Sequence, residues 1–234
     1  PIEFHLADQG IFNFPYIWHF NTFVAAGFKL FLAIVIVSMM SNEYTNKTIK
    51  QNLIDGLSKK EFIASKFLTV LVFSGISTIF VFVVSLILGA MYSDYTELSI
   101  VFSDLEFLIA FFVKLVGFFS FCLFLGILVK RSAFALGFLI IWAIAEQVIF
   151  GLLGWKVVSW ETAKVIKSFL PLESMANLIK EPFSRLNAVQ SVADQIGEQI
   201  ELNYHVNWYE IVLVLLWTAL FIYLSYALLR KRDL

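Results

Sequence analysis

The sequence predicts an all-α membrane protein, built as a bundle of transmembrane helices joined by short loops. Of its 234 residues, 60% are apolar, and the mean hydropathy is +0.83. A soluble domain of ordinary composition is only about half apolar, so the excess is expected to face lipid. The apolar stretches are also long and continuous, which favours helices over the short alternating segments of a β-barrel.

Five stretches are long enough to span the hydrocarbon core, which needs about 20 mostly apolar residues. They cover residues 17–40, 67–91, 107–129, 133–153 and 208–229. The charged residues that interrupt them are Lys29, Lys114, Glu146 and Glu210. The whole chain, residues 1–234, is therefore predicted to form a single transmembrane domain.

The Lys and Arg residues of the short loops predict the orientation, because cytoplasmic loops carry an excess of positive charge. Such residues concentrate at 41–66, 130–131 and 230–232, which all fall on one side of the membrane. We take that side as the cytoplasm of a bacterium, so the protein is expected in the plasma membrane with its C-terminus inside. The acidic loop at 94–106 then faces outward. The N-terminus also begins outside, which predicts one more transmembrane helix before Pro1.

The loop 41–66 is predicted to form a helical elbow between the first two spans. Its first half should continue the preceding helix to about Asp55, and Gly56 suits the left-handed turn that ends a helix. Ser58 and Glu61 have the S-x-x-E spacing of a capping box, which would start the helix that leads into the next span. A simple connector between two spans explains this pattern equally well.

The same loop resembles the first cytoplasmic loop of type-2 ABC transporter permeases, the membrane-spanning subunits of ATP-binding-cassette exporters. The residues that carry this resemblance are Glu43, Lys47, Thr48, Leu53, Ile54, Gly56, Ser58, Lys59 and Lys66. The C-terminal sequence Arg-Lys-Arg-Asp-Leu at 230–234 is similar to the family's usual ending. The family has six spans and a long outer segment before the last one, and this sequence fits that order if one span is missing at its start.

The resemblance implies that the loop holds a coupling helix, which docks in a cleft of a separate ATP-binding-cassette ATPase subunit. It further implies a dimer with a second permease copy, and ATP and Mg²⁺ bound by the partner subunits, with no cofactor or metal in this chain. We predict the ATPase contact over residues 46–59. The apolar anchors would be Ile49, Leu53 and Ile54, and the polar rim would be Lys50 and Lys59.

The chain contains no recognisable catalytic motif. The patterns G-x-x-x-x-G-K-[ST], H-E-x-x-H, C-x-x-C and G-x-S-x-G are all missing, so the chain is not expected to bind ATP by a P-loop or to act as an enzyme. The net charge of -1 gives no support for nucleic-acid binding. The alternatives are a polytopic intramembrane enzyme, which would need Glu and His clustered at one depth, and a secondary transporter or channel, which would need internal repeats. An ABC assembly that transmits force without carrying a solute also stays open.

Two charges inside the predicted spans call for partners. Lys114 and Glu146 each lie roughly 10 Å below the outer edge of neighbouring spans, counted at the rise of an α-helix. An isolated charge in lipid costs several kcal/mol, so we predict that they form an ion pair. The pair would fix the helix register or line a substrate path. Lys29 lies deeper, either at a subunit interface or with its ammonium reaching toward the surface.

The long segment 155–207 is predicted to lie on the outer side, as short helices at the membrane surface followed by a polar part at 184–201. The resemblance implies that the outer end of the preceding span folds back here as re-entrant helices above the translocation path. The 26 Phe residues of the chain would suit a lipid or hydrophobic peptide as substrate. Contact with bilayer lipid would favour the same residues, so the substrate stays unassigned.

Overall fold

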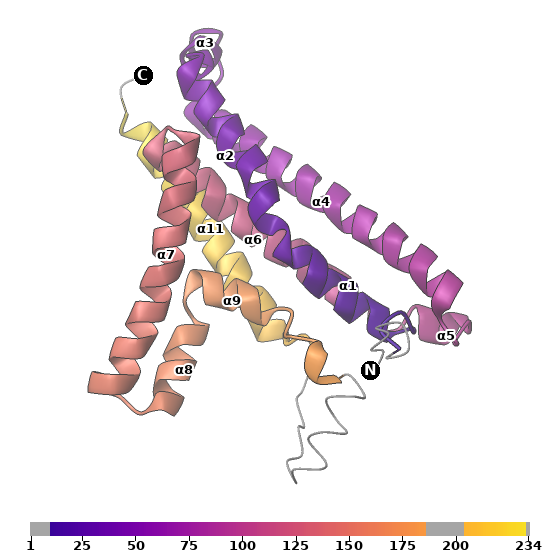
Figure 1. Ribbon diagram of the computed structural model, residues 1–234. Coiled ribbons are helices and arrows are strands. Elements are labelled where there is room, and N and C mark those ends of the chain that lie inside the picture. The colour runs from indigo at the N-terminus through magenta and orange to yellow at the C-terminus, as the bar shows by residue number, and fades with distance from the viewer. Residues whose placement is uncertain (1–9, 186–203, 233–234) are drawn as a thin grey trace.

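The computed structural model describes residues 10–185 and 204–232, and every regular element within them is a helix (Figure 1). This confirms the predicted all-α class. In chain order the elements are α1 (Tyr16–Gly27), α2 (Lys29–Thr45), α3 (Thr48–Ile54), α4 (Lys59–Tyr92), α5 (Leu98–Val101), α6 (Glu106–Val129), α7 (Ser132–Leu152), the π-helical turn η2 (Leu153–Val157), α8 (Trp160–Ser168), α9 (Pro171–Asn177), the 3₁₀ turn η3 (Phe183–Arg185) and α11 (Trp208–Arg230).

Helix α6 forms the centre of the bundle, and α11, α2, α4 and α7 pack around it. Its most apolar window is 83% buried, whereas the corresponding windows of α4, α7 and α11 are only 11–22% buried. Gly117 allows α11 to approach closely, because a Cβ there would lie 2.7 Å from a methyl group of Val214. The surrounding helices turn large apolar side chains outward, such as Phe31, Phe80 and Leu216. A bundle with an apolar outside suits a lipid environment.

The first predicted span, residues 17–40, is broken rather than straight. Four helices of the described chain are long and apolar enough to cross a membrane. Helices α1 and α2 meet at an angle of 49° and meet the same criterion only when they are taken together as one bent span. Gly27 ends α1, and glycine is a poor helix former. The N–H of Phe28 donates to the Ala25 carbonyl, which replaces the α-helical bond by a tighter 3₁₀-type one. Lys29 therefore begins a new helix in the middle of this bent pair.

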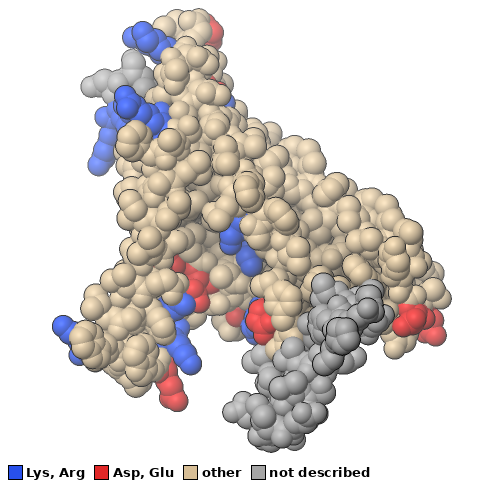
Figure 2. All heavy atoms as spheres, viewed as in Figure 1, with Lys and Arg blue, Asp and Glu red and all other residues tan. Residues whose placement is uncertain are grey.

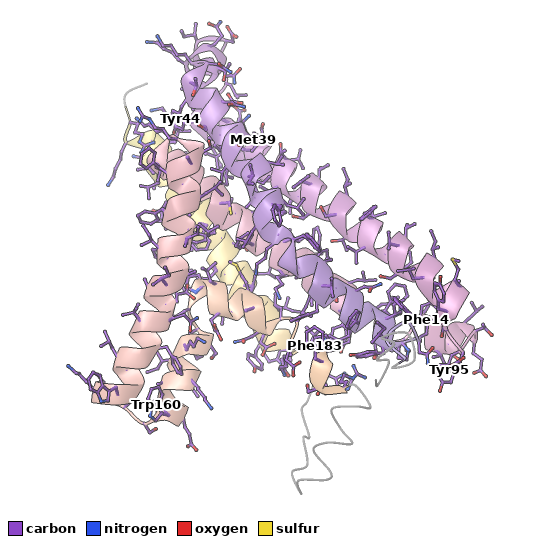
Figure 3. The ribbon with its side chains drawn as sticks, viewed as in Figure 1. Phe14, Met39, Tyr44, Tyr95, Trp160 and Phe183 are labelled. Carbon is purple, nitrogen blue, oxygen red and sulfur yellow. The ribbon has the colours of Figure 1, made fainter. Side chains whose placement is uncertain are left out.

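The bundle opens from one end toward the other (Figure 1). Helix α3 and the end of α11 lie at what we call the elbow end, while α5 and the turn between α7 and α8 lie at the far end. In Figure 3, Tyr44 marks the first of these ends and Trp160 the second. Helix α8 folds back from the tip of α7, and α9 then packs beside α11 and α6.

Figure 2 shows a hollow on the side of α8 and α9, in which acidic and basic side chains gather; further charged side chains lie at the elbow end and at the far end. Helices α8 and α9 make up much of the predicted outer segment 155–207 that the structure describes. The polar stretch predicted at 184–201 lies almost entirely outside the described residues.

Candidate functional site

The predicted elbow, residues 41–66, consists of the end of α2, the short helix α3 and the start of α4. The prediction of one continuous helix to Asp55 is wrong, because the chain breaks at Asn46 and Lys47. Asn46 is a weak helix former, and the exposed Lys47 adopts a left-handed conformation with φ of 57°. Gly56 makes the second turn with φ of 101°, as expected. Helix α3 is therefore a separate helix between two left-handed turns.

The start of α4 contains the predicted capping box. The Ser58 hydroxyl accepts the backbone N–H of Glu61 at 3.2 Å, and the Glu61 carboxylate accepts the backbone N–H of Ser58 at 2.9 Å. Hydrogen bonds from the Ser58 hydroxyl and backbone lower the pKa of Glu61. The carboxylate stays charged at neutral pH, where it also complements the helix dipole. Ser58 thus fixes the point at which the chain leaves the elbow.

Glu43 joins the three helices of the elbow. Its carboxylate forms an ion pair with Lys66 of α4 and accepts a hydrogen bond from the Thr48 hydroxyl at the start of α3. The side chains of Glu43 and Lys66 are only 16% and 15% exposed. Burial alone would raise the pKa of Glu43, but the hydrogen bonds from Lys66 and Thr48 and the Lys66 charge outweigh it and lower the pKa. Two predicted site residues, Glu43 and Thr48, therefore bond to each other, and Lys66, which also carries the family resemblance, bonds to the same carboxylate.

The residues that directly follow α11 hold the elbow against the bundle. The Lys59 ammonium donates to the Arg232 carbonyl at 2.8 Å. The Arg232 guanidinium donates to the carbonyls of Ile127 and Leu128 and to the Tyr44 hydroxyl. The carbonyls at the end of α6, which have no partner within the helix, are satisfied in this way. Lys59 was predicted at the rim of a partner contact, but its ammonium is bonded within the chain. Sequence reasoning did not find the role of Arg232.

The outward-facing part of the elbow, which we call the knob, comprises α3 and the turn that follows. Ile49 was predicted as an anchor for the partner, but it is 2% exposed and packs into the bundle, so it is not available for contact. Leu53 is half-buried on the same face, since residues four apart share a helix face. Ile54 is instead 69% exposed, and Leu57 and Lys50 are exposed beside it. The knob thus presents an apolar tip with a basic neighbour.

Lys114 and Glu146, the predicted ion pair, do not bond to each other. Both are almost completely buried. The Lys114 ammonium donates to the Ala176 carbonyl at 3.2 Å, while the Glu146 carboxylate accepts the backbone N–H groups of Leu172 and Glu173 at 3.0 and 3.1 Å. The helix α9 lies within reach of both side chains and supplies each with a backbone partner, which the spacing along the two spans could not indicate.

This pair of contacts, which we call the α9 clamp, holds α9 at both ends. Glu146 lies at its N-terminus and Lys114 near its C-terminus, and each has the charge that the helix dipole favours there. Pro171 occupies the first turn of α9, where no N–H donor is needed. The indole N–H of Trp142 also donates to Glu146 at 2.9 Å. In the sequence, the one sign of this arrangement is the spacing of four residues between Trp142 and Glu146, which places both on the same face of a helix.

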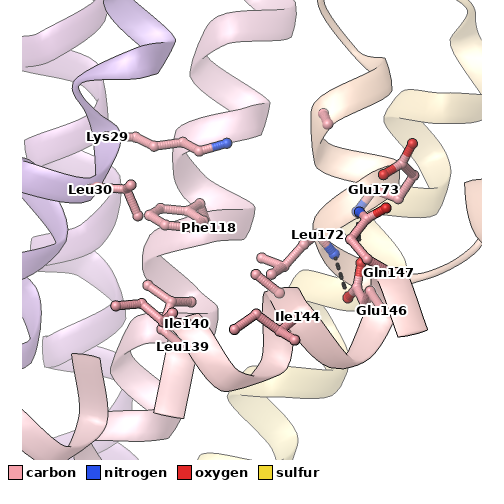
Figure 4. A pocket seen from close by; sticks show the side chains of 12 residues that line it. Lys29, Leu30, Phe118, Leu139, Ile140, Ile144, Glu146, Gln147, Leu172 and Glu173 are labelled. Carbon is pink, nitrogen blue, oxygen red and sulfur yellow. Dashed lines mark hydrogen bonds between the residues drawn. The ribbon is translucent and has the colours of Figure 1, made fainter. Parts of the chain in front are cut away.

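A cavity of about 520 Å³ lies beside the α9 clamp, between α2, α6, α7 and α9 (Figure 4). Lys29 extends into it from the α1–α2 break, with its ammonium 5.0 Å from the centre of the Phe118 ring. The side chains of Glu146, Gln147 and Glu173 form a polar side, and the rest of the lining is mainly apolar. The structure thus places Lys29 and Glu146 in one cavity, although they belong to different spans.

Comparison with known proteins gives one positive result. The model of a family described as "ABC-2 family transporter protein" matches residues 7–234. A search of curated proteins and a search of solved structures each found no match. The family match extends over the elbow, the α9 clamp and the cavity.

Proposed function

The chain belongs to the ABC-2 family of transporter proteins, and from this premise we propose that it is the permease of an ATP-driven exporter whose ATPase subunit docks on the knob. The family makes it a multi-pass membrane subunit of an ABC transporter that associates with an ABC ATPase subunit. Our proposal adds an outward direction of transport, a second permease copy in the complex, and a lipid or other hydrophobic substrate.

The exposed tip of the knob is the observation that carries this proposal. Ile54 and Leu57 face away from the bundle at the elbow end, beside the exposed Lys50. Burying such side chains against a partner is favourable by about 25 cal/mol per Å² of apolar surface. A partner cleft lined by apolar groups with an acidic rim would match this surface.

The bracing of the elbow supports a mechanical role. Glu43 and Lys66 join α2 to α4, and Lys59 joins the start of α4 to Arg232, just after α11. A push on α3 would therefore move several long helices together, as expected for rigid-body coupling. In this scheme ATP and Mg²⁺ bind the ATPase subunit, and the permease catalyses no reaction.

We further propose that the elbow end faces the cytoplasm of a bacterium, with the C-terminus on that side. The basic residues at 41–66, 130–131 and 230–232 support this orientation, because positive loops stay inside. The α8–α9 hairpin would then enter the membrane from the outer side.

Co-purification with a candidate ATP-binding-cassette subunit tests the docking site. Ile54→Glu and Lys50→Glu should weaken the complex and abolish stimulation of ATP hydrolysis, and both residues are exposed, so the permease itself should still fold. Lys164→Glu makes the same charge change at an exposed site on α8 and should have no effect. Lys59 is unsuitable for this test, because it bonds within the chain. Full binding and stimulation by Ile54→Glu and Lys50→Glu would refute the proposal.

A further inference from the structure

Lys29 places a positive charge near the middle of the bent pair α1–α2, which taken together is long and apolar enough to cross a membrane. It is the first residue of α2 in the bent pair that runs from Tyr16 to Thr45, so roughly 20 Å of helix separates it from either end. A charge at this depth is expensive unless it is compensated. A broken helix inside a membrane is tolerated mainly where it lines a cavity or packs in protein, and substrate sites of transporters often lie at such breaks.

The charge on Lys29 is not compensated within the described chain. No carboxylate of residues 10–185 or 204–232 forms an ion pair with its ammonium, which instead lies against the Phe118 ring. The acidic groups of the cavity are already bonded elsewhere. Glu146 accepts two backbone N–H groups at the start of α9, and Glu173 pairs with Lys167 at 3.1 Å. Among the residues that the structure describes, none holds the Lys29 ammonium in an ion pair, so it can pair with an anionic ligand in the cavity.

The walls of the cavity indicate what kind of anion this is. Leu30, Ile140 and Ile144 line the cavity, and each is more than half exposed on the bundle surface. The opening is thus apolar and faces the lipid side of α2 and α7. A free aqueous anion would have to cross this apolar rim, whereas an amphiphile could enter from the bilayer with its tail against the same side chains. The volume of about 520 Å³ lies within the usual range of ligand pockets, about 300–1,000 Å³.

We propose that this cavity binds a membrane-embedded amphiphile with an anionic headgroup, which pairs with the Lys29 ammonium while the tail lies along Leu30, Ile140 and Ile144. The binding itself needs only the cavity. The interpretation of the bound amphiphile as transported cargo rests on the proposed permease function.

The test uses the full chain in nanodiscs of phosphatidylcholine and two dansyl-labelled amphiphiles of equal tail length. One probe carries a carboxylate headgroup and the other a quaternary ammonium. The wild-type protein should bind the carboxylate probe more tightly. Lys29→Met should weaken that binding by about tenfold or more, the loss expected for a charge-assisted hydrogen bond, and should leave the ammonium probe unchanged. Lys29→Arg should largely preserve binding of the carboxylate probe.

Lys60→Met serves as the matched control, because Lys60 lines a different apolar cavity between α4 and α11. It should bind both probes as the wild type does. Equal binding of the two probes by the wild type, or unchanged binding by Lys29→Met, would overturn the proposal, as would full displacement of the carboxylate probe by inorganic phosphate. Lys29→Arg separates loss of charge from loss of fold. Failure of the permease proposal would appear separately, as a chain that binds the probe but no ATPase subunit.

Discussion

The elbow and the α9 clamp each hold a short helix in place, but in different surroundings. Helices α3 and α9 each have seven residues and are too short to be stable alone. Each is held by a carboxylate from a long helix, Glu43 for α3 and Glu146 for α9. Glu43 bonds to two side chains near the bundle surface, whereas Glu146 bonds to backbone N–H groups inside the bundle.

The loss of a hydrogen-bond partner should have a different cost in each of the two environments. At the elbow end, water can replace a lost side-chain partner, so an ion pair adds stability without being indispensable. Beside α9, the backbone groups at the start of the helix have few other partners, and an unsatisfied buried group is expensive. We therefore expect the α9 clamp to be the more sensitive of the two, and the following predictions test that order.

The largest effect is expected at Glu146. Glu146→Leu leaves two backbone N–H groups and the Trp142 indole without their acceptor, which should lower the free energy of unfolding by about 2–4 kcal/mol. Glu146→Gln retains one acceptor oxygen and should lose about half as much. Unfolding by SDS in mixed micelles, followed by tryptophan fluorescence, measures both. Gln147→Leu alters the neighbouring cavity residue and should change little, and an equally small change for Glu146→Leu would disprove the clamp.

An intermediate effect is expected at Arg232, which lies at the elbow end. Its guanidinium donates to backbone carbonyls, just as the Glu146 carboxylate accepts backbone N–H groups. Arg232→Ala should cost about 1–3 kcal/mol in the same assay, because the carbonyls of Ile127 and Leu128 lose their donor. Arg230→Ala is the control, since Arg230 is an exposed residue of the same segment. If both variants lose the same amount, the effect comes from general charge and not from these bonds.

The smallest effect is expected at the ion pair of the elbow. A double-mutant cycle with Glu43→Gln and Lys66→Met should give a coupling of about 1 kcal/mol or less, as for other partly exposed pairs. The lowered pKa of Glu43 sets the pH dependence. The stabilisation should be complete above the ordinary glutamate pKa of 4.5 and be lost as the pH falls through the lowered value. A coupling energy larger than the loss of unfolding free energy in Glu146→Leu would contradict the expectation that the α9 clamp is the more sensitive region.

The same contrast explains what could be predicted from the sequence. Four of the five predicted spans and the capping box at Ser58 depend on composition and on residues three apart, and each matches a helix or cap of the structure. The left-handed turn at Gly56 was predicted for the same reason, since glycine favours it locally. The burial of Ile49 depends on which way α3 packs, and an isolated helical pattern does not contain that information.

The arrangement around α9 could not be predicted, because its bonds join residues of different elements. Glu146 is 26 residues from Leu172, and Lys114 is 62 residues from Ala176. The predicted depth of Lys114 and Glu146 in two neighbouring spans correctly indicated that each charge needs a partner. It did not indicate that a third helix, α9, would supply both partners. The break before Lys29 was missed as well, because hydropathy averaged over a window cannot detect a bend.

Docking of an ATPase subunit on the knob is the central claim, and thiol labelling tests it most directly. Cys122 is the single cysteine of the chain and is buried, so Cys122→Ala gives a background in which Ile54→Cys is the only thiol. A maleimide should label this residue readily in the permease alone and slowly once the ATPase subunit is bound. Labelling of Thr96→Cys, at the far end, should not change. Equally fast labelling of Ile54→Cys with and without the bound ATPase subunit would contradict the claim.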